Sequence, residues 1–163
     1  TTTSEGPDEP ADLSLLAVLS ASSVLAAQGE VDYEAKRLVD GDPSTCWAEG
    51  ATGYGLGEYV EFAFPSSVTI TALSIVPGYD KSLDGWDRWT SNGRVRSFVL
   101  VFSDGTSETY SVTDTRDPQT ITLSAPRTVT WVRFVIDGVY EAEEGPNKAE
   151  DTSVSELHFW GTE

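Results

Sequence analysis

The 163-residue chain is poor in cysteine and histidine, and each shortage excludes a class of site. Its one cysteine, Cys46, cannot form an internal disulfide, and zinc sites built from several thiolates and CxxC redox motifs are excluded with it. Its one histidine, His158, has no plausible nucleophile nearby, which argues against a hydrolytic triad. No apolar run approaches the roughly 20 residues that a transmembrane helix needs, so we expect a soluble chain.

Basic residues are also scarce, with 10 Lys and Arg against 27 Asp and Glu, for a net charge of -17. This balance repels phosphate backbones and anionic lipid surfaces, so we expect neither nucleic acid as a partner nor insertion into a membrane. An acidic surface suits cations, basic proteins or neutral ligands such as sugars. An acidic surface is equally consistent with a protein whose charge serves only to keep it soluble.

Hydrophobic residues make up 39% of the chain and aromatic residues 10%, which suffices for one domain of ordinary size. Residues 1–10 hold prolines with polar and acidic residues, a composition typical of an extended linker. We predict a tether over residues 1–10 and one domain over residues 11–163. Because the sequence starts Thr-Thr-Thr-Ser without Met, we expect a mature or excised fragment, a monomeric module within a larger protein.

Alternating apolar residues, β-branched residues and turn residues predict strands along most of the chain. The clearest signal is a hairpin, in which Asp104-Gly105 supplies the tight turn between residues 97–102 and 108–112. Residues 13–27 fit a helix and a buried strand equally well. Further strands are predicted over residues 59–64, 68–76, 120–123, 128–136 and 153–160. At least seven short strands without long amphipathic helices favour an all-β antiparallel sandwich.

A candidate cation loop lies between Tyr33 and Trp47. Asp40 and Asp42 flank a glycine, and Thr45 follows, so a tight loop would turn several oxygens toward one point. Calcium binds about 6 to 8 hard oxygens, more than this loop supplies, so a further ligand has to come from elsewhere. The same residues also fit a plain Asx turn, and spacing alone does not separate the two interpretations.

Residues 77–94 are a long excursion between strands that holds two Trp, one Tyr, two Arg, one Lys and one Asn. Flat aromatic rings stack on the apolar face of a pyranose, while Asn, Arg and Lys donate hydrogen bonds to its hydroxyl groups. The excursion is therefore a candidate sugar-binding surface; alternatively, its tryptophans fold back and close the end of the sandwich. The candidate ligand-binding residues here are Tyr79, Lys81, Trp86, Arg88, Trp89, Asn92 and Arg94.

Two other loops are candidates for the border of a binding face. The glycine-rich residues 49–58 lack the Gly-Lys-Ser/Thr of a phosphate-binding loop, and we interpret them as a second lip that presents Glu49 and Tyr54. A flexible connection is an equally good interpretation. The acidic residues 141–151 precede the last predicted strand and would border either metal or ligand, although such runs are usually solvated loops.

Several motifs occur in a fixed order between residues 21 and 161. They are Ala21-Ser22-Ser23, Leu38-Val39-Asp40-Gly41-Asp42-Pro43-Ser44-Thr45 with Trp47, Gly57-Glu58-Tyr59-Val60-Glu61-Phe62, and Ser155-Glu156-Leu157-His158-Phe159-Trp160-Gly161. This set resembles the discoidin domains, also called coagulation factor 5/8 type C domains, which are related to carbohydrate-binding modules of galactose-binding-like fold. A second set resembles their bacterial subgroup, the NADase-type glycan-binding domain. It comprises Trp47-Ala48-Glu49-Gly50, Gly78-Tyr79-Asp80-Lys81, Asn92-Gly93-Arg94-Val95 and Phe102-Ser103-Asp104-Gly105.

The resemblance implies a galactose-binding-like jelly-roll β-sandwich of two antiparallel sheets, with both termini at one end. It also implies a structural Ca2+ site that joins the first loop to the last strand. Carried over by position, the side-chain ligands are those of Asp40, Thr45 and Glu156, and the backbone carbonyl ligands are those of Arg37, Asp42 and Ser155.

The implied function is a non-catalytic glycan-binding module of a secreted or cell-surface bacterial protein, attached through the N-terminal linker. Two other classes stay open. The exposed aromatic residues would also serve a protein-adhesion or sensor domain as interface anchors. A small glycoside-cleaving enzyme would need a pair of carboxylates, such as Glu49 and Glu58.

Overall fold

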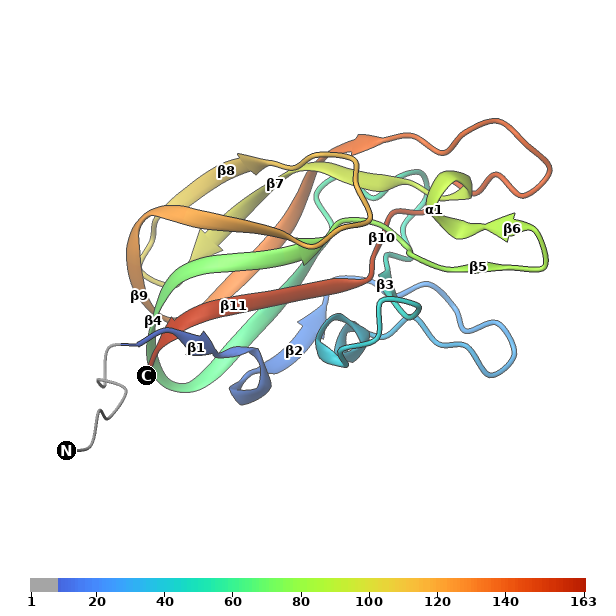
Figure 1. The fold of residues 1–163 in the computed structure, drawn as a ribbon. Coiled ribbons are helices and arrows are strands. Elements are labelled where there is room, and N and C mark those ends of the chain that lie inside the picture. The colour runs from blue at the N-terminus through green and yellow to red at the C-terminus, as the bar shows by residue number, and fades with distance from the viewer. Residues whose placement is uncertain (1–8) are drawn as a thin grey trace.

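Two long antiparallel strands, β4 (Tyr59–Val76) and β9 (Gln119–Tyr140), form the centre of the fold in the computed structural model, which describes residues 9–163 (Figure 1). Each bends near its middle, where the strand carries a proline, Pro65 in β4 and Pro126 in β9. Proline has no N–H to donate to the ladder, and the pairing of β4 with β9 is interrupted between Ala63 and Val68. The bends let one strand contribute to two layers.

Strand pairing defines these two layers. The first contains β2 (Val18–Ala21), the first half of β4, the second half of β9, β7 (Arg94–Phe102) and β8 (Ser107–Ser111). The second contains β1 (Ala11–Asp12), β11 (Glu156–Thr162), the second half of β4 and the first half of β9. All these pairings are antiparallel, so the predicted all-β jelly-roll sandwich is confirmed. Its two layers are parts of one seven-stranded hydrogen-bonded sheet.

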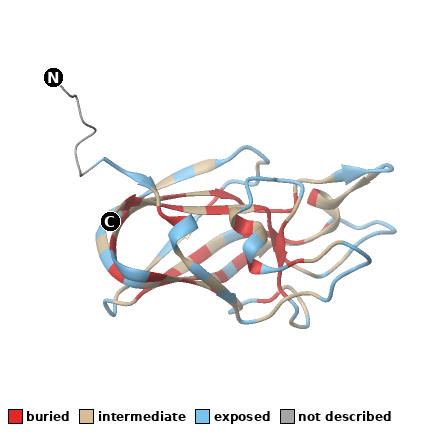
Figure 2. Cartoon of the chain, turned by 90° about the horizontal axis from the view of Figure 1, so that it is seen from below, coloured by how far each residue is buried: buried red, intermediate tan, exposed pale blue. Residues whose placement is uncertain are grey.

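The core lies between the layers and is formed by alternate residues of the strands, as Figure 2 shows by the red segments inside the sandwich. Phe62 of β4 meets Phe159 of β11 edge-on, with ring centroids 4.9 Å apart. Phe98 of β7 stacks on Phe134 of β9 at 4.7 Å. Each such ring, fully buried, stabilises the fold by roughly 1.5–3 kcal/mol.

Short elements gather at the end of the sandwich away from the described chain ends (Figure 1). They are β3 (Trp47–Ala48) paired with β10 (Ser153–Val154), β5 (Ser82–Leu83) paired with β6 (Trp86–Asp87), and α1 (Arg88–Ser91). The 3-10 helices η1 (Ser14–Leu16) and η2 (Ala35–Val39) lie in the N-terminal segment. Within residues 9–163, no helix combines the length and the apolar character that crossing a membrane requires.

The predicted hairpin is confirmed as β7 and β8, with Gly105 at φ 90° in its turn. Other predicted strands are parts of longer ones, because residues 59–64 and 68–76 belong to β4, and residues 120–123 and 128–136 to β9. Residues 13–27 form neither one helix nor one strand, but η1 followed by β2. The predicted tether over residues 1–10 falls almost entirely outside the described residues, which include only the exposed Glu9 and Pro10 of it. It therefore stays a prediction.

Candidate ligand pocket and cation loop

A cavity of about 450 Å³ opens among the loops at the β5–β6 end of the sandwich. This volume lies in the range of roughly 300–1,000 Å³ that is typical of small-molecule sites. Three segments far apart in the sequence form its wall, residues 25–33, 79–92 and 146–153. The lining residues are Leu25, Gln28, Val31, Tyr33, Tyr79, Lys81, Trp86, Arg88, Asn92, Pro146, Asn147, Lys148, Ala149, Asp151 and Ser153.

Three aromatic side chains line the cavity. Tyr33 and Tyr79 are buried and meet edge-on, with ring centroids 6.3 Å apart. Trp86 is partly exposed, and its indole N–H donates a hydrogen bond to the Ser91 hydroxyl at 2.8 Å. The Arg88 guanidinium lies over the Trp86 ring at 3.9 Å from the centroid. These contacts hold the rings in place before any ligand enters.

Polar groups are interspersed among the rings. The Arg88 Nη1 donates to the carbonyls of Leu83 at 3.1 Å and Trp86 at 2.9 Å. The Asn92 side-chain amide donates to the Arg88 carbonyl at 2.9 Å, and its own carbonyl oxygen accepts no hydrogen bond from the described residues. Asp151 is half-buried, and this burial raises the pKa of its carboxyl group. The cavity thus offers both donors and acceptors beside apolar rings.

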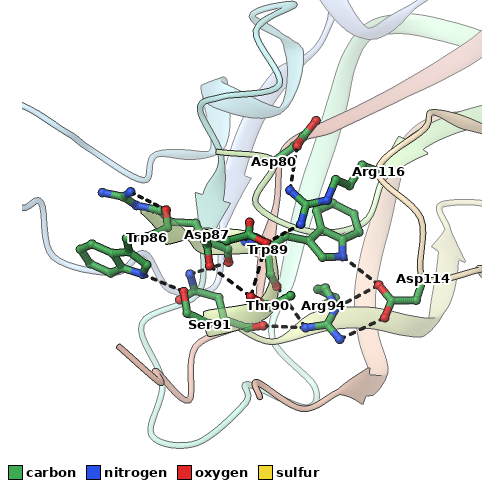
Figure 3. A network of polar contacts seen from close by, with 11 residues as sticks. Asp80, Trp86, Asp87, Trp89, Thr90, Ser91, Arg94, Asp114 and Arg116 are labelled. Carbon is green, nitrogen blue, oxygen red and sulfur yellow. Dashed lines mark hydrogen bonds and ion pairs between the residues drawn. The ribbon is translucent and has the colours of Figure 1, made fainter. Parts of the chain in front are cut away.

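Behind the cavity wall lies an ion-pair network that includes two of the predicted ligand-binding residues (Figure 3). Trp89 and Arg94 are 4% and 5% exposed, and both donate to the carboxylate of Asp114. Arg116 pairs with Asp87 and approaches Asp80. The structure thus does not bring the predicted ligand contacts Trp89 and Arg94 to the cavity: both make hydrogen bonds within the protein, and Trp89 folds back against the sandwich.

The glycine-rich loop was also expected to present ligand-binding side chains, but the structure does not bring Glu49 or Tyr54 to the cavity. Glu49 is fully buried, and its two oxygens accept the backbone N–H groups of Thr152 at 3.0 Å and Ala51 at 2.8 Å. The Tyr54 hydroxyl accepts the N–H of Ala142, and its carbonyl accepts the hydroxyl of Thr152. The loop supports the segment before β10 from behind, and neither side chain lines the cavity.

Five of the nine predicted ligand-binding residues, Tyr79, Lys81, Trp86, Arg88 and Asn92, do meet at the cavity. The sequence interpretation missed the contribution of residues 25–33, whose composition carries no binding signal. It anticipated the contribution of the acidic loop 141–151 only as a possible border, and residues 146–151 indeed form one wall.

The predicted cation loop follows η2 and contains the Asx turn that was the alternative interpretation. Asp40 Oδ1 accepts the N–H of Asp42 at 2.9 Å, and Asp40 Oδ2 accepts the hydroxyl of Thr45 at 2.5 Å. The Asp42 carbonyl lies 2.9 Å from the same hydroxyl. Arg37 pairs with Asp32 at 2.8 Å and lies 3.8 Å from Asp40. The loop therefore folds on its own hydrogen bonds.

The start of β11 lies against this loop. The Ser155 hydroxyl donates to the carbonyl of Pro43 at 2.6 Å. Glu156 Oε2 bonds to His158 at 2.6 Å, whereas Glu156 Oε1 is buried and has no hydrogen-bond partner among residues 9–163. Burial raises the pKa of Glu156 against the opposing effect of His158, and the nearby Asp40 carboxyl raises it further. Two carboxyl groups thus approach each other, and one of them has an unsatisfied oxygen.

This arrangement fits the donor set that the sequence resemblance implies for calcium. Within residues 9–163, no group of three or more His, Cys, Asp or Glu side chains is placed to hold a metal ion. The implied set does not depend on such a group, because only Asp40 and Glu156 contribute carboxylates. The other donors are a hydroxyl and backbone carbonyls, and a set made entirely of oxygen suits Ca2+. The unsatisfied oxygen of Glu156 is the feature that a cation would complete.

Comparison with known families decides where the chain belongs. The family model described as the NAD glycohydrolase translocation F5/8 type C domain matches residues 12–160. The chain belongs to this family. A search of curated protein sequences found no significant match to the chain.

Solved structures of several bacterial proteins have a fold similar to that of this chain. The family 32 carbohydrate-binding module of C. perfringens NanJ, in complex with galactose, has a TM-score of 0.63 at 13% identity over 93% of this chain and 98% of that chain. A second C. perfringens module, in complex with GalNAc-β-1,3-galactose, has a TM-score of 0.65 at 18% identity, covering 91% and 99%. The F5/8 type C domain of a Bacteroides fragilis protein has a TM-score of 0.62 at 16% identity, covering 97% and 99%. At these identities the similarity is one of fold.

Proposed function

We propose that this F5/8 type C domain is a non-catalytic glycan-binding module of a secreted or cell-surface bacterial protein. The observation that carries the proposal is the cavity of about 450 Å³ at the loop end, where aromatic rings and hydrogen-bonding groups line the same wall. A pyranose has an apolar face that stacks on a ring and hydroxyl groups that need both donors and acceptors. Two neighbours in fold, which were solved with galactose or a galactose-containing disaccharide, support the proposal.

The residues that line the cavity include a stacking ring, hydrogen-bond donors and hydrogen-bond acceptors. Trp86 is the partly exposed ring, held by Ser91 and covered on one side by Arg88. Lys81 and Arg88 are donors, and Asn92 and Asp151 offer acceptor oxygens. Because Trp86, Arg88 and Asn92 are fixed by protein contacts, these three side chains lose little entropy when a ligand binds.

The carboxylates of the chain support binding rather than glycoside cleavage. A glycosidase of the common type needs two carboxyl groups that flank the scissile bond. Within residues 9–163, Asp151 is the one acidic residue that lines the cavity. The pair Glu49 and Glu58 does not serve, because both oxygens of Glu49 accept backbone N–H groups in the interior and Glu58 accepts the hydroxyl of Ser22.

We also propose a structural Ca2+ held by the side chains of Asp40, Thr45 and Glu156 with carbonyls of Arg37, Asp42 and Ser155. The buried, unpartnered Oε1 of Glu156 supports this site. Bound calcium would cross-link the η2 loop to β11, so its binding free energy would add to the stability of the fold. The ion would have a structural role and no catalytic role.

A glycan array probed with the labelled chain, followed by calorimetry of the best ligand, tests the glycan-binding proposal. We expect saccharide binding, and we expect Trp86→Ala to weaken it at least about tenfold because a stacking face is lost. Trp131→Ala is the matched control, since Trp131 is also partly exposed but lies on β9 away from the cavity. Absence of any glycan ligand, or equal affinity of the Trp86→Ala variant, would contradict the proposal.

A further inference from the structure

Most of the few basic residues of this acidic chain form ion pairs with carboxylates. All ten Lys and Arg residues lie in the described part of the chain, and six of them form ion pairs with carboxylates. Within residues 9–163, the four without such a pair are Lys36, Lys81, Arg88 and Arg96. Two of these four, Lys81 and Arg88, line the same cavity. In a chain with 27 acidic residues, two unpaired cations at one site call for an explanation.

Neither cation has a carboxylate within ion-pair distance among the described residues, and each lies beside neutral groups. The Arg88 guanidinium is fixed by the Leu83 and Trp86 carbonyls and by the Trp86 ring, which are neutral partners. Its bonds to the carbonyls use Nη1, and Nη2 and Nε have no hydrogen-bond partner among the described residues. The Lys81 ammonium lies 5.9 Å from the centroid of the Tyr79 ring, again a neutral partner. Both side chains therefore keep donors that have no acceptor in the described part of the chain.

The other charged groups of the cavity do not cancel this positive charge. Lys148 also lines the cavity and pairs with Glu144 on the exposed loop. Of the acidic residues that the structure describes, only Asp151 lines the cavity. The lining therefore carries three cationic side chains and one carboxyl group, whereas the whole chain has a net charge of -17.

We propose that the saccharide bound in this cavity is acidic, and that Lys81 and Arg88 together hold its carboxylate. This inference rests on the proposed glycan-binding function and specifies its ligand class. A neutral sugar would shield both cations from water without giving them a counter-charge, which is costly. A carboxylate, as in uronic or sialic acids, supplies charge-assisted hydrogen bonds to both groups.

The acidic surface does not prevent an anion from entering. Screening at physiological ionic strength limits charge interactions in solvent to about 8 Å, so distant carboxylates act weakly on a ligand in the cavity. Lys81 and Arg88 would be in direct contact with it, where screening is small. The net charge of the chain and the charge of its cavity can therefore have opposite signs without conflict.

Calorimetry with two matched ligand pairs tests the inference. Trigalacturonic acid and its fully methyl-esterified form share rings and hydroxyl groups and differ in charge; 3'-sialyllactose and lactose differ by one acidic sugar. We expect the acid of at least one pair to bind about tenfold or more tightly than its neutral counterpart. Equal affinity of acid and neutral form in both pairs, or no binding of either acid by a chain that binds neutral glycans on the array, would overturn the inference and leave the glycan-binding function standing.

Variants locate the effect at the cavity. We expect Lys81→Gln to weaken binding of the preferred acid about tenfold and to leave any affinity for its neutral counterpart unchanged, with Lys81→Arg restoring most of the loss. Lys36→Gln is the matched control, because Lys36 is also unpaired but lines a separate groove beside Leu19 and Asp32. Equal losses from Lys81→Gln and Lys36→Gln would indicate a long-range charge effect and overturn the inference. A chain that binds no glycan at all would overturn the proposed function with it.

Discussion

Arg94 and Asp114 form a bidentate ion pair beneath the cavity wall, with Nε to Oδ1 at 2.9 Å and Nη2 to Oδ2 at 3.0 Å (Figure 3). The same Asp114 Oδ1 accepts the indole N–H of Trp89 at 2.9 Å. Arg94 also donates to the carbonyls of Trp89 and Asn92 through Nη1. The pair thus connects β7 to the segment after β8 and fixes α1, which carries part of the cavity wall.

Removing Asp114 should destabilise the protein strongly. Asp114→Ala leaves the buried Arg94 without its counter-charge and Trp89 without its acceptor, and we expect a loss of about 3 kcal/mol in the free energy of unfolding. Urea unfolding followed by tryptophan fluorescence measures it. Glu61→Ala is the control, because Glu61 pairs with Arg133 nearer the surface and should cost less than about 1 kcal/mol. Equal losses in the two variants would show that the Arg94 pair has no special role.

Calcium should raise the melting temperature of the domain. A ligand at about 100 times its dissociation constant stabilises by about 2.7 kcal/mol, which corresponds to a rise of roughly 5 °C or more at this size. We expect this rise in millimolar calcium relative to chelator, and we expect Glu156→Gln to abolish it. Glu61→Gln, the same change at a residue that pairs with Arg133 of β9 and is not among the proposed ligands, should keep it. A melting temperature that calcium does not move would contradict the proposed site.

Glu108 should make stability depend on pH in the acidic range. Its carboxylate accepts hydrogen bonds from Ser124, Tyr110 and Arg127, which lower its pKa from 4.5 to about 2 despite partial burial. Because the folded-state pKa lies below the unfolded value, this contribution is complete above about pH 4.5 and disappears as the pH falls toward about 2.

Urea midpoints between about pH 6 and about pH 3 measure this contribution. We expect Glu108→Gln to be less stable than the parent chain at the upper limit, with the difference shrinking as the pH falls. Glu141→Gln is a change on an exposed loop, and its stability should differ from that of the parent chain by the same amount at every pH. A constant difference between Glu108→Gln and the parent would rule out this titration.

Glu49 should affect the cavity without touching the ligand. Glu49→Ala leaves the N–H groups of Thr152 and Ala51 unpaired in the interior, and we expect a loss of about 2 kcal/mol in stability. The segment before β10 would lose its support, so binding should weaken as well. Glu58→Ala is the comparison, since Glu58 is partly exposed and should have a small effect. Binding lost with stability unchanged would instead indicate that Glu49 contacts the ligand.

The strands could be predicted from the sequence because their signals are local. Asp104-Gly105 between two apolar runs is sufficient for a hairpin, and the alternation of Val60, Phe62 and Phe64 is sufficient for a half-buried strand. The continuity of β4 and β9 across Pro65 and Pro126 could not be predicted, because a proline between strands usually marks a turn.

Which residues line the cavity depends on contacts between segments that are far apart in the sequence. Tyr33 and Asp151 meet at one wall because β3 pairs with β10, a contact that no local pattern specifies. The inventory of residues 77–94 pointed to a loop that does line the cavity, but it did not specify the direction of each side chain. Trp86 and Trp89 have the same binding potential, yet Trp89 is committed to Asp114, whose place beside it depends on the tertiary fold.

The most direct measurement is a crystal structure of the chain with the tightest-binding saccharide from the array. We predict electron density for a sugar ring against Trp86, with its polar groups in contact with Lys81 or Arg88 above the buried Tyr79. A saccharide bound elsewhere on the sandwich, with this cavity vacant, would contradict the assignment of the site.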